Sequence, residues 1–327
     1  MSIVAEFARE LHEKWSAIED RSLRPISFRP AMEKLDDVRV VIFDVYGTLF
    51  NYWKPVFEQE VSKNKALLET FAKTASYFGM EPYLMEMNPK EPPEKTLWDL
   101  YHGLISLKRD LLYEKEIKFP EIRIEEVWLA ILLMLKRRGF AFVKSDFGSD
   151  GELARCIAYY YNFHVFNRGF YPGVADALLS LKKKNLMLGI LSNAQFYTPI
   201  DLTLFLRDQS EGHIDDMGEV FERGLVFFSY EYTMAKPSQT LFRKLFDALY
   251  EVHALPSQSV FVGNDLASDI KPAKEAGMKT ALFTGDDRCA FVHDLEDSIV
   301  PDIAFSDWNE LPPLISFHKP KKEVKGA

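Results

Sequence analysis

The stretch that decides the fold is Val41-Ile42-Phe43-Asp44-Val45-Tyr46-Gly47-Thr48-Leu49. Its three leading apolar residues end a run that starts at Val38 and has the pattern of a fully buried strand. An acid and then a glycine turn follow directly, so we expect the carboxylate of Asp44 to lie exposed at one edge of a sheet. An ordinary acid in a turn at the end of a strand has the same pattern, so this motif alone does not establish a catalytic site.

Further strands and helices alternate along the second half of the chain. The predicted strands are Met187–Leu191, Leu225–Ser229, Ser259–Val262 and Lys279–Phe283. The predicted helices between them are Ala175–Lys184, Ser238–Val252 and Ile270–Ala276. This alternation predicts an α/β fold, with a parallel sheet covered by helices on both faces.

A long helical insertion separates the first strand from the second. Well over a hundred residues lie between them, far more than one crossover needs. Helix-like apolar spacing marks Pro55–Phe78, Lys95–Leu112, Ile124–Gly139 and Gly151–Tyr161. An insertion at this point lies over the carboxyl ends of the strands, where open α/β sheets bind ligands, so we expect it to act as a lid.

The chain therefore divides into four parts. We predict an N-terminal helical extension at residues 1–37, a core at 38–50 and 170–317, the helical insertion at 51–169, and a flexible tail at 318–327. The 327 residues suffice for two compact domains.

Composition limits the possible partners and location. The formal net charge of −9 argues against nucleic acid or an anionic membrane as a partner. The longest apolar run, Val127–Leu135, is too short to span a bilayer, and Met1–Trp15 lacks the apolar stretch of a signal peptide. Cys156 and Cys289 are far apart and have no metal-binding spacing. We therefore expect a cytoplasmic protein that acts on a small molecule; its oligomeric state stays open.

Polar residues also follow the later strands of the predicted sheet. Ser192 and Asn193 end the second strand and could donate hydrogen bonds to an oxyanion, although helix capping is the commoner role of such a pair. Lys236 precedes a helix and could neutralise a phosphate or carboxylate, although most isolated lysines are solvated surface residues. These residues would therefore reach the same edge of the sheet as Asp44.

An acidic group follows the fourth strand. Asn264, Asp265 and Asp269 offer clustered oxygen ligands that suit Mg²⁺, although helix capping explains any one of them. In chain order, the groups expected at this edge of the sheet are a nucleophile, an anion-binding hydroxyl, a cation and an acidic pair, from Asp44, Ser192, Lys236, and Asp265 with Asp269. That joint occurrence predicts an active site.

In these motifs the sequence resembles the haloacid dehalogenase (HAD) superfamily of hydrolases, over about residues 38–50 and 170–310. The matching segments are Asp44-Val45-Tyr46-Gly47-Thr48, Ser192-Asn193, Lys236-Pro237, and Gly263-Asn264-Asp265 with Asp269. The resemblance implies a Rossmann-like core, a helical cap formed by the insertion, and a covalent aspartyl-enzyme intermediate.

The resemblance also assigns roles to single residues. It implies catalytic positions at Asp44, Tyr46, Thr48, Ser192, Asn193 and Lys236. It implies that Mg²⁺ is bound by a set drawn from Asp44, Val45, Asn264, Asp265 and Asp269. Whether Asn264 or Asp265 faces the metal stays open, because the family tolerates both spacings to the second acid.

The first motif departs from the phosphatases of the family. They usually carry a second Asp, the general acid and base, where this chain has Tyr46. A positioned acid typically contributes about 10²–10⁴-fold in rate, most of all for poor leaving groups such as alkoxides. Asp-x-Tyr-Gly-Thr is typical of the 2-haloacid dehalogenases, in which halide leaves unprotonated. Tyr46 therefore favours carbon–halogen cleavage.

The fourth motif favours a phosphatase. The dehalogenases work without a metal, with an Asn where this chain has Leu266, and use an early cap Arg that has no counterpart between Asp44 and Arg109. Asp44, Asp265 and Asp269 converging without a cation would also repel one another. We therefore predict a Mg²⁺-dependent phosphatase acting on a small, anionic, phosphorylated metabolite. The alternatives are a metal-independent 2-haloacid dehalogenase and a non-catalytic binder of phosphate ligands.

Overall fold

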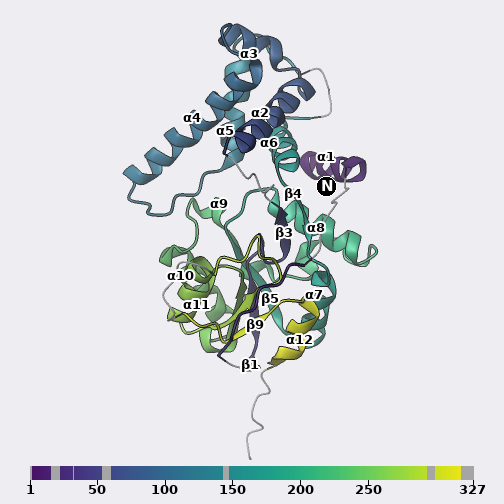
Figure 1. Ribbon diagram of the computed structural model, residues 1–327, viewed down its shortest axis with the longest axis vertical. Coiled ribbons are helices and arrows are strands. Elements are labelled where there is room, and N and C mark those ends of the chain that lie inside the picture. Colours follow the sequence, from purple (N-terminus) through teal and green to yellow (C-terminus); the bar gives the residue numbers. More distant parts are fainter. Residues whose placement is uncertain are drawn as a thin grey trace, which may run out of the picture. The chain divides into compact units, whose positions relative to one another are not determined.

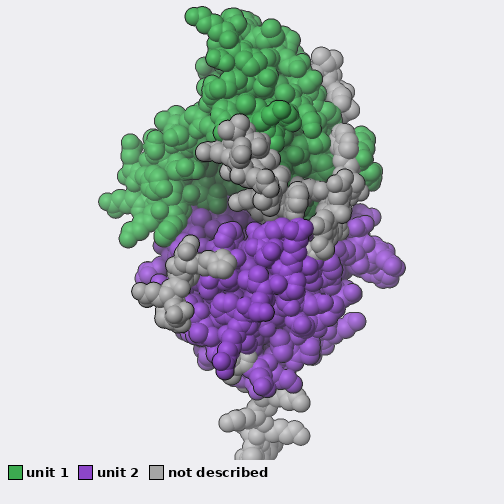
Figure 2. Space-filling model, in the orientation of Figure 1, with its two compact units in different colours: residues 1–19, 52–169, 195–204 green, residues 20–51, 170–194, 205–327 purple. Residues whose placement is uncertain are grey.

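The computed structural model describes residues 2–15, 23–31, 33–53, 60–142, 147–292 and 299–317. The chain forms two compact units (Figure 2). The helical unit comprises Met1–Glu19, Tyr52–Gly169 and Gln195–Leu204, and the sheet unit comprises Asp20–Asn51, Phe170–Ala194 and Phe205–Ala327. The predicted flexible tail, residues 318–327, lies outside the described residues.

A six-stranded parallel sheet forms the centre of the sheet unit. In spatial order its strands are β6 (Val226–Phe228), β5 (Met187–Ser192), β2 (Val40–Phe43), β7 (Ser259–Gly263), β8 (Lys279–Phe283) and β9 (Ile303–Phe305). Every residue of β2 and β7 is buried, as expected for a parallel sheet covered on both faces. The predicted α/β fold is confirmed.

Helices cover both faces of this sheet. Figure 1 shows α10 (Gln239–Glu251) and α11 (Lys271–Glu275) on one side, and α7 (Val174–Lys183) and α12 (Leu311–Leu314) on the other. The predicted apolar stripe of α10, including Leu241 and Leu245, packs in one core cluster with Ile42 of β2. Because both leucines are fully buried, replacing either with Ala would cost about 2–5 kcal/mol of stability.

The N-terminal segment, which the sequence suggests is one extension, is divided between the units. Helix α1 (Ile3–Trp15) belongs to the helical unit and buries the side chains of Phe7 and Leu11. Strand β1 (Leu35–Val38) belongs to the sheet unit and pairs in parallel with β10 (Ile315–Phe317).

The helical unit contains the insertion. Its helices are α2 (Glu60–Tyr77), α3 (Glu81–Met87), α4 (Pro93–Glu114), α5 (Ile124–Lys136), α6 (Asp150–Val165) and the start of α8 (Thr198–Gln209). Aromatic side chains fill its core: the ring of Phe71 lies 4.5 Å from that of Tyr161 and 5.7 Å from that of Trp98. The short strands β3 (Phe50–Trp53) and β4 (Asn167–Phe170) pair where the chain passes between the units.

No helix in the described part of the chain has the length and apolar character needed to cross a membrane.

Candidate active site

The Asp44 carboxylate lies directly after β2, the strand paired with β5 on one side and with β7 on the other. The prediction that this carboxylate lies exposed is wrong: the residue is only 5% exposed, because three side chains surround the carboxylate and donate hydrogen bonds to it. Thr48 Oγ1 is 3.1 Å from Oδ2, whereas Ser192 Oγ and Lys236 Nζ are 3.0 and 2.6 Å from Oδ1. The structure therefore brings together four of the predicted site residues, which come from three separate segments of the chain.

Lys236 is a buried cation placed between two acids. Its Nζ lies 2.6 Å from Asp44 Oδ1 and 2.6 Å from Asp269 Oδ1. Burial lowers the pKa of Lys236, but the two carboxylates outweigh burial and raise the pKa to about 12. The side chain is therefore charged at neutral pH and can hold an anion or a developing negative charge.

Asp269 fixes Lys236 and the end of β7. Its Oδ2 accepts hydrogen bonds from the backbone N–H groups of Asn264 and Asp265, each at 3.2 Å. Burial raises the pKa of Asp269 to about 7, against the opposite influence of Lys236. A Cβ atom on Gly263 would come within 2.3 Å of Asp269 Oδ2, so this approach of carboxylate to backbone requires glycine.

Asn264, rather than Asp265, contacts Thr48 beside the candidate nucleophile, Asp44. Asn264 Oδ1 is 3.0 Å from Thr48 Oγ1, and its Nδ2 donates to the carbonyl of Cys289, which fixes the orientation of the amide. Asp265 accepts hydrogen bonds from the backbone N–H groups of Ala267 and Ser268 at 2.7 and 2.9 Å. Asp265 is thus a capping residue at the start of the π-helical turn Leu266–Ile270.

Three of the five predicted Mg²⁺ ligands, Val45, Asp265 and Asp269, have other partners within the protein. The carbonyl of Val45 already accepts the N–H groups of Leu49 and Phe50, each at 2.8 Å. Asp265 caps a helical turn, and Asp269 is bound to Lys236 and to backbone. Within the described ranges, no group of three or more His, Cys, Asp and Glu side chains is arranged to hold a metal ion.

A smaller oxygen pair remains that fits a hard cation. Thr48 Oγ1 lies 3.1 Å from Asp44 Oδ2 and 3.0 Å from Asn264 Oδ1, but a hydroxyl has one proton to donate. One of the two oxygens is therefore left without the Thr48 proton. Mg²⁺ in proteins is often held by one or two protein oxygens, with waters and substrate phosphate in its other positions. Asp44 and Asn264 meet that requirement.

The remaining predicted residues have positioning contacts. Asn193 Oδ1 accepts the backbone N–H of Lys236 at 2.6 Å, and its Nδ2 donates to the Lys236 carbonyl at 3.3 Å. Asn193 therefore holds the lysine loop against the end of β5. The ring of Tyr46 meets that of Phe50 edge-on, with 5.6 Å between the ring centres. Tyr46, which stands where a second acid was sought in the first motif, therefore packs against an aromatic ring.

Two supporting residues could not be found from the sequence. Ser229 Oγ accepts the N–H of Ala194 at 2.8 Å and fixes the chain just after Ser192. Cys289 supports Asn264 through a backbone carbonyl, and carbonyl contacts leave no signal in residue type. Gly47 has a φ of +83°, and a Cβ atom there would lie 2.4 Å from Asn264 Nδ2. Glycine at this position of the first motif therefore permits the backbone conformation and leaves room for the side-chain amide of Asn264.

The family profile described as haloacid dehalogenase-like hydrolase matches residues 38–277. Glyceraldehyde 3-phosphate phosphatase of Pyrococcus furiosus is 32% identical over 130 residues, which are 40% of this chain and 48% of that protein. The chain thus spans about half the length of that relative. An uncharacterized protein of Saccharomyces cerevisiae is 23% identical over 82% of this chain and 79% of its own length.

A similar solved structure is that of a 2-haloacid dehalogenase from Pseudomonas syringae. It has a TM-score of 0.52 and 19% identity, and the match covers 85% of this chain and 97% of that one. At this level of identity the likeness concerns the fold alone.

Proposed function

Because the chain belongs to the haloacid dehalogenase-like hydrolase family, we propose that it is a Mg²⁺-dependent phosphatase that acts on a small phosphorylated metabolite through Asp44. The observation that carries the proposal is the convergence of Thr48, Ser192 and Lys236 on the Asp44 carboxylate. A buried carboxylate held by three donors is oriented for attack, and the same donors can serve an incoming phosphate.

The reaction would proceed as two displacements. A carboxylate oxygen of Asp44 forms a bond to phosphorus, and the bond from phosphorus to the leaving oxygen breaks, which gives an aspartyl phosphate. Water then forms a bond to the phosphorus of that intermediate, and the bond from phosphorus to the Asp44 oxygen breaks, which restores the carboxylate and releases inorganic phosphate; the proton that the water loses passes to solvent. Lys236 and Ser192 would stabilise the negative charge that develops in both steps.

Asp44 and Asn264 would hold the cation, with water and phosphate oxygens in its other positions. When bound, Mg²⁺ neutralises charge on the transferred phosphoryl group. Because Tyr46 replaces a general acid, we expect substrates whose leaving group departs without a proton, such as acyl and aryl phosphates, to react fastest. The similarity to a phosphatase named for glyceraldehyde 3-phosphate supports a small phosphorylated substrate.

A 2-haloacid dehalogenase is the second candidate, and the position of Lys236 favours it. Lys236 Nζ is 2.6 Å from both Asp44 and Asp269, and Asp265 is engaged as a cap. Lys236 thereby reduces the repulsion between the carboxylates, so that no metal cation is needed to offset it. Against this candidate stands the absence of any Arg between Asp44 and Arg109.

The deciding experiment assays an aryl phosphate and a 2-haloalkanoate side by side, each with Mg²⁺ and with EDTA. Phosphate release that EDTA abolishes and that Asp44→Asn eliminates supports the proposal. Halide release that EDTA does not affect selects the dehalogenase. If neither product forms in an Asp44-dependent way while inorganic phosphate binds in a calorimetric titration, the non-catalytic phosphate-ligand binder is selected.

A matched pair of variants tests the cation site. Asn264→Asp adds a charged oxygen beside Asp44 and is expected to lower the Mg²⁺ concentration needed for half-maximal activity by about tenfold. Asp265→Asn changes the neighbouring residue in the opposite direction and is expected to leave that concentration unchanged, because Asp265 caps a helical turn. The reverse result would contradict the assignment of Asn264.

A further inference from the structure

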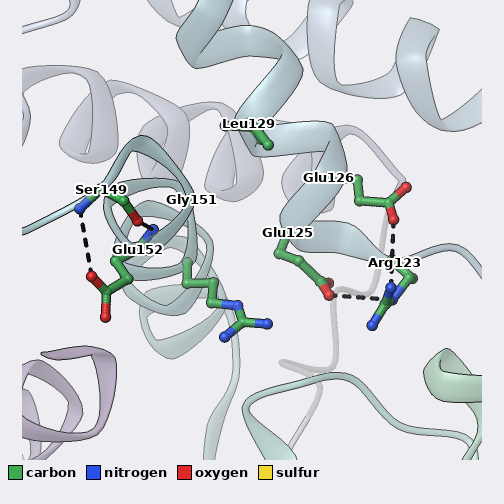
Figure 3. Close-up of a pocket in the computed structure, with 8 residues that line it drawn as sticks. Arg123, Glu125, Glu126, Leu129, Ser149, Gly151 and Glu152 are labelled. Atoms are coloured by element: carbon green, nitrogen blue, oxygen red, sulfur yellow. Dashed lines mark hydrogen bonds and ion pairs between the residues drawn. The ribbon is translucent and has the colours of Figure 1, made fainter. Parts of the chain in front are cut away.

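The helical unit contains a pocket of about 300 Å³ between the starts of α5 and α6 (Figure 3). Its three acids pair with groups of the protein. Glu125 Oε1 lies 3.5 Å from Arg123 Nε, and Glu126 Oε1 lies 3.8 Å from Arg123 Nη1. Glu152 forms a capping box with Ser149. These groups therefore stabilise the starts of the two helices, whereas a buried polar network in the sheet unit reaches the candidate active site.

Tyr171 lies at the centre of this network and directly follows β4. It is fully buried, and its backbone N–H donates to the carbonyl of Leu49 at 3.0 Å. Leu49 directly follows the first motif, so this bond places Tyr171 next to the segment that carries Asp44. The ring of Tyr171 packs against that of Phe283, the last residue of β8, with 5.0 Å between the ring centres. Backbone and ring together therefore hold Tyr171 in place.

The hydroxyl of Tyr171 donates to a buried carboxylate in the loop after β8. Tyr171 Oη lies 2.9 Å from Asp286 Oδ2, and Asp286 is 1% exposed. Arg288 also donates to this carboxylate, with Nε 2.7 Å from Oδ1 and Nη2 3.0 Å from Oδ2. Burial raises the pKa of Tyr171, and Cys289 and Asp286 raise it further. The phenol therefore keeps its proton at neutral pH and acts as a donor.

Tyr171 and Asp286 together fix Cys289. The Cys289 backbone N–H donates to the Asp286 carbonyl at 3.1 Å, and the Cys289 side chain forms a hydrogen bond with Tyr171. The backbone N–H of Arg288 donates to Asp286 Oδ1 at 3.1 Å, which closes the turn immediately before Cys289. The Cys289 carbonyl in turn accepts Asn264 Nδ2. The orientation of the Asn264 amide thus depends on a turn that Tyr171 and Asp286 hold.

The Asn264 amide carries this arrangement to the candidate nucleophile. Because its Nδ2 is bonded to the Cys289 carbonyl, its Oδ1 faces Thr48 Oγ1 at 3.0 Å. Thr48 Oγ1 lies 3.1 Å from Asp44 Oδ2. An Asn264 amide that lost its bond to Cys289 could rotate, and its oxygen would no longer be fixed beside Thr48.

We propose that Tyr171 is a positioning residue of the active site: its hydroxyl holds the turn at Asp286 and Cys289, and this turn orients Asn264 Oδ1. The consequence for Mg²⁺ rests on the proposed function, in which Asn264 is a ligand of the cation. Outer partners of a metal ligand commonly contribute about 10–100-fold in metal affinity. Loss of the Tyr171 hydroxyl should therefore affect Mg²⁺ binding more than the chemical step.

The test replaces Tyr171 with Phe, which removes only the hydroxyl, and uses Tyr159→Phe as the matched control. Both hydroxyls donate to a buried carboxylate, but Tyr159 lies in the helical unit. Both variants are therefore expected to lower the Tm by similar amounts. Only Tyr171→Phe is expected to alter the Asn264 amide.

The side-chain amide of Asn264 can be observed by NMR of the full chain labelled with ¹⁵N-asparagine, because Asn264→Asp removes its signal and so identifies it. In Tyr171→Phe the amide protons are expected to exchange with solvent about tenfold faster than in the parent chain, and in Tyr159→Phe less than about twofold faster. Equal rates in the parent and in Tyr171→Phe, or equal increases in both variants, would overturn the proposal. This measurement needs neither Mg²⁺ nor substrate.

Calorimetric titration with Mg²⁺ measures the consequence for the cation. Tyr171→Phe is expected to weaken Mg²⁺ binding by about tenfold, and to raise the Mg²⁺ concentration for half-maximal hydrolysis of an aryl phosphate by the same factor. The kcat at saturating Mg²⁺ should change by less than about threefold, and Tyr159→Phe should change neither quantity. A fall in kcat with unchanged Mg²⁺ affinity would contradict the positioning role. A parent chain that binds no Mg²⁺ would contradict the proposed function, and the exchange rate of the Asn264 amide would still decide the role of Tyr171.

Arg288→Lys is a second variant of the same network. It keeps a positive charge beside Asp286 but gives up the paired contacts of the guanidinium. We expect it to speed exchange of the Asn264 amide by about threefold. If Tyr171→Phe does not fold, an exchange rate in Arg288→Lys equal to that of the parent chain would overturn the proposal.

Discussion

Each unit contains a buried charge cluster, and the two clusters differ in how completely their acids are compensated. In the sheet unit one cation, Lys236, serves two acids, Asp44 and Asp269. In the helical unit one cation, Arg168, serves one acid: its Nε is 2.6 Å from Asp201 Oδ2, and Tyr159 donates to Oδ1 at 2.5 Å.

The pKa values follow this difference. Burial raises the pKa of Asp201, but Arg168, His12 and Tyr159 together outweigh burial and lower it. The pKa of Asp269 is instead raised to about 7, because burial outweighs its share of Lys236. Asp201, which has a cation of its own, therefore keeps its charge more readily than a free carboxyl group, whereas Asp269, which shares Lys236 with Asp44, takes up a proton more readily.

The largest difference is expected in catalysis. Asp44→Asn should lower kcat by about 10³-fold or more, because an amide cannot form the aspartyl intermediate. Asp201→Asn should change kcat of the folded protein by less than about threefold, since the Asp201 cluster lies in the helical unit. Steady-state rates, corrected for the folded fraction, test both. Comparable losses would mean that the two clusters do not differ in function.

Stability should show the reverse order. Asp201→Asn leaves Arg168 buried without its charged partner and should lower the free energy of unfolding by about 3–5 kcal/mol. Asp44→Asn leaves Lys236 paired with Asp269 and should cost about 1 kcal/mol or less. Urea unfolding measures both values. A larger loss for Asp44→Asn would assign the Lys236 cluster a structural role instead.

Removing one hydroxyl donor from each cluster is a milder comparison. Ser192→Ala should lower kcat by about 10²–10³-fold, as for the loss of one preorganised donor, with little loss of stability. Tyr159→Phe should leave kcat unchanged and cost about 1–3 kcal/mol, since a buried oxygen of Asp201 loses its donor. If Ser192→Ala retains full activity, the convergence on Asp44 has no catalytic value.

The smallest expected effect is in the pH dependence of stability. The raised pKa of Asp269 gives a stabilising contribution that is present below its ordinary pKa of 3.8 and is lost as pH rises toward about 7. The lowered pKa of Asp201 gives a contribution that is present above 3.8 and is lost as pH falls. The contribution of each acid is the free energy of unfolding of the parent chain minus that of the Asn variant, measured from acid to neutral pH. This difference should fall with rising pH for Asp269→Asn and rise with pH for Asp201→Asn. Parallel slopes would contradict the comparison.

Most of the candidate site follows from sequence because it depends on strand ends. The carboxyl ends of neighbouring parallel strands lie at one edge of a sheet, so locating β2 and β5 brings Asp44 near Ser192. The choice between Asn264 and Asp265 depends on the geometry of one turn, and both residue types suit either role. The carbonyl of Val45 is occupied by backbone N–H groups of its own turn, which residue type does not reveal.

Other features depend on contacts between distant segments. Strand β9 has three residues, too few to show an apolar pattern. Strand β1 pairs with β10, which lies near the C-terminal end of the described chain. The pair Arg168 and Asp201 carries no motif, although it is as buried as the cluster of Lys236, Asp44 and Asp269. Such pairs are selected by packing, which local patterns do not encode.

The candidate nucleophile, Asp44, lies directly after an inner strand of the sheet. β2 is bonded along its length to β5 and β7, and the Asp44 N–H continues this ladder to the carbonyl of Val262 at 2.9 Å. A shift of the backbone at Asp44 would break this hydrogen bond to β7. Any adjustment of reacting distance during turnover must therefore come from the side chain or from the substrate, and the amide proton of Asp44 should be among the slowest in the chain to exchange with solvent.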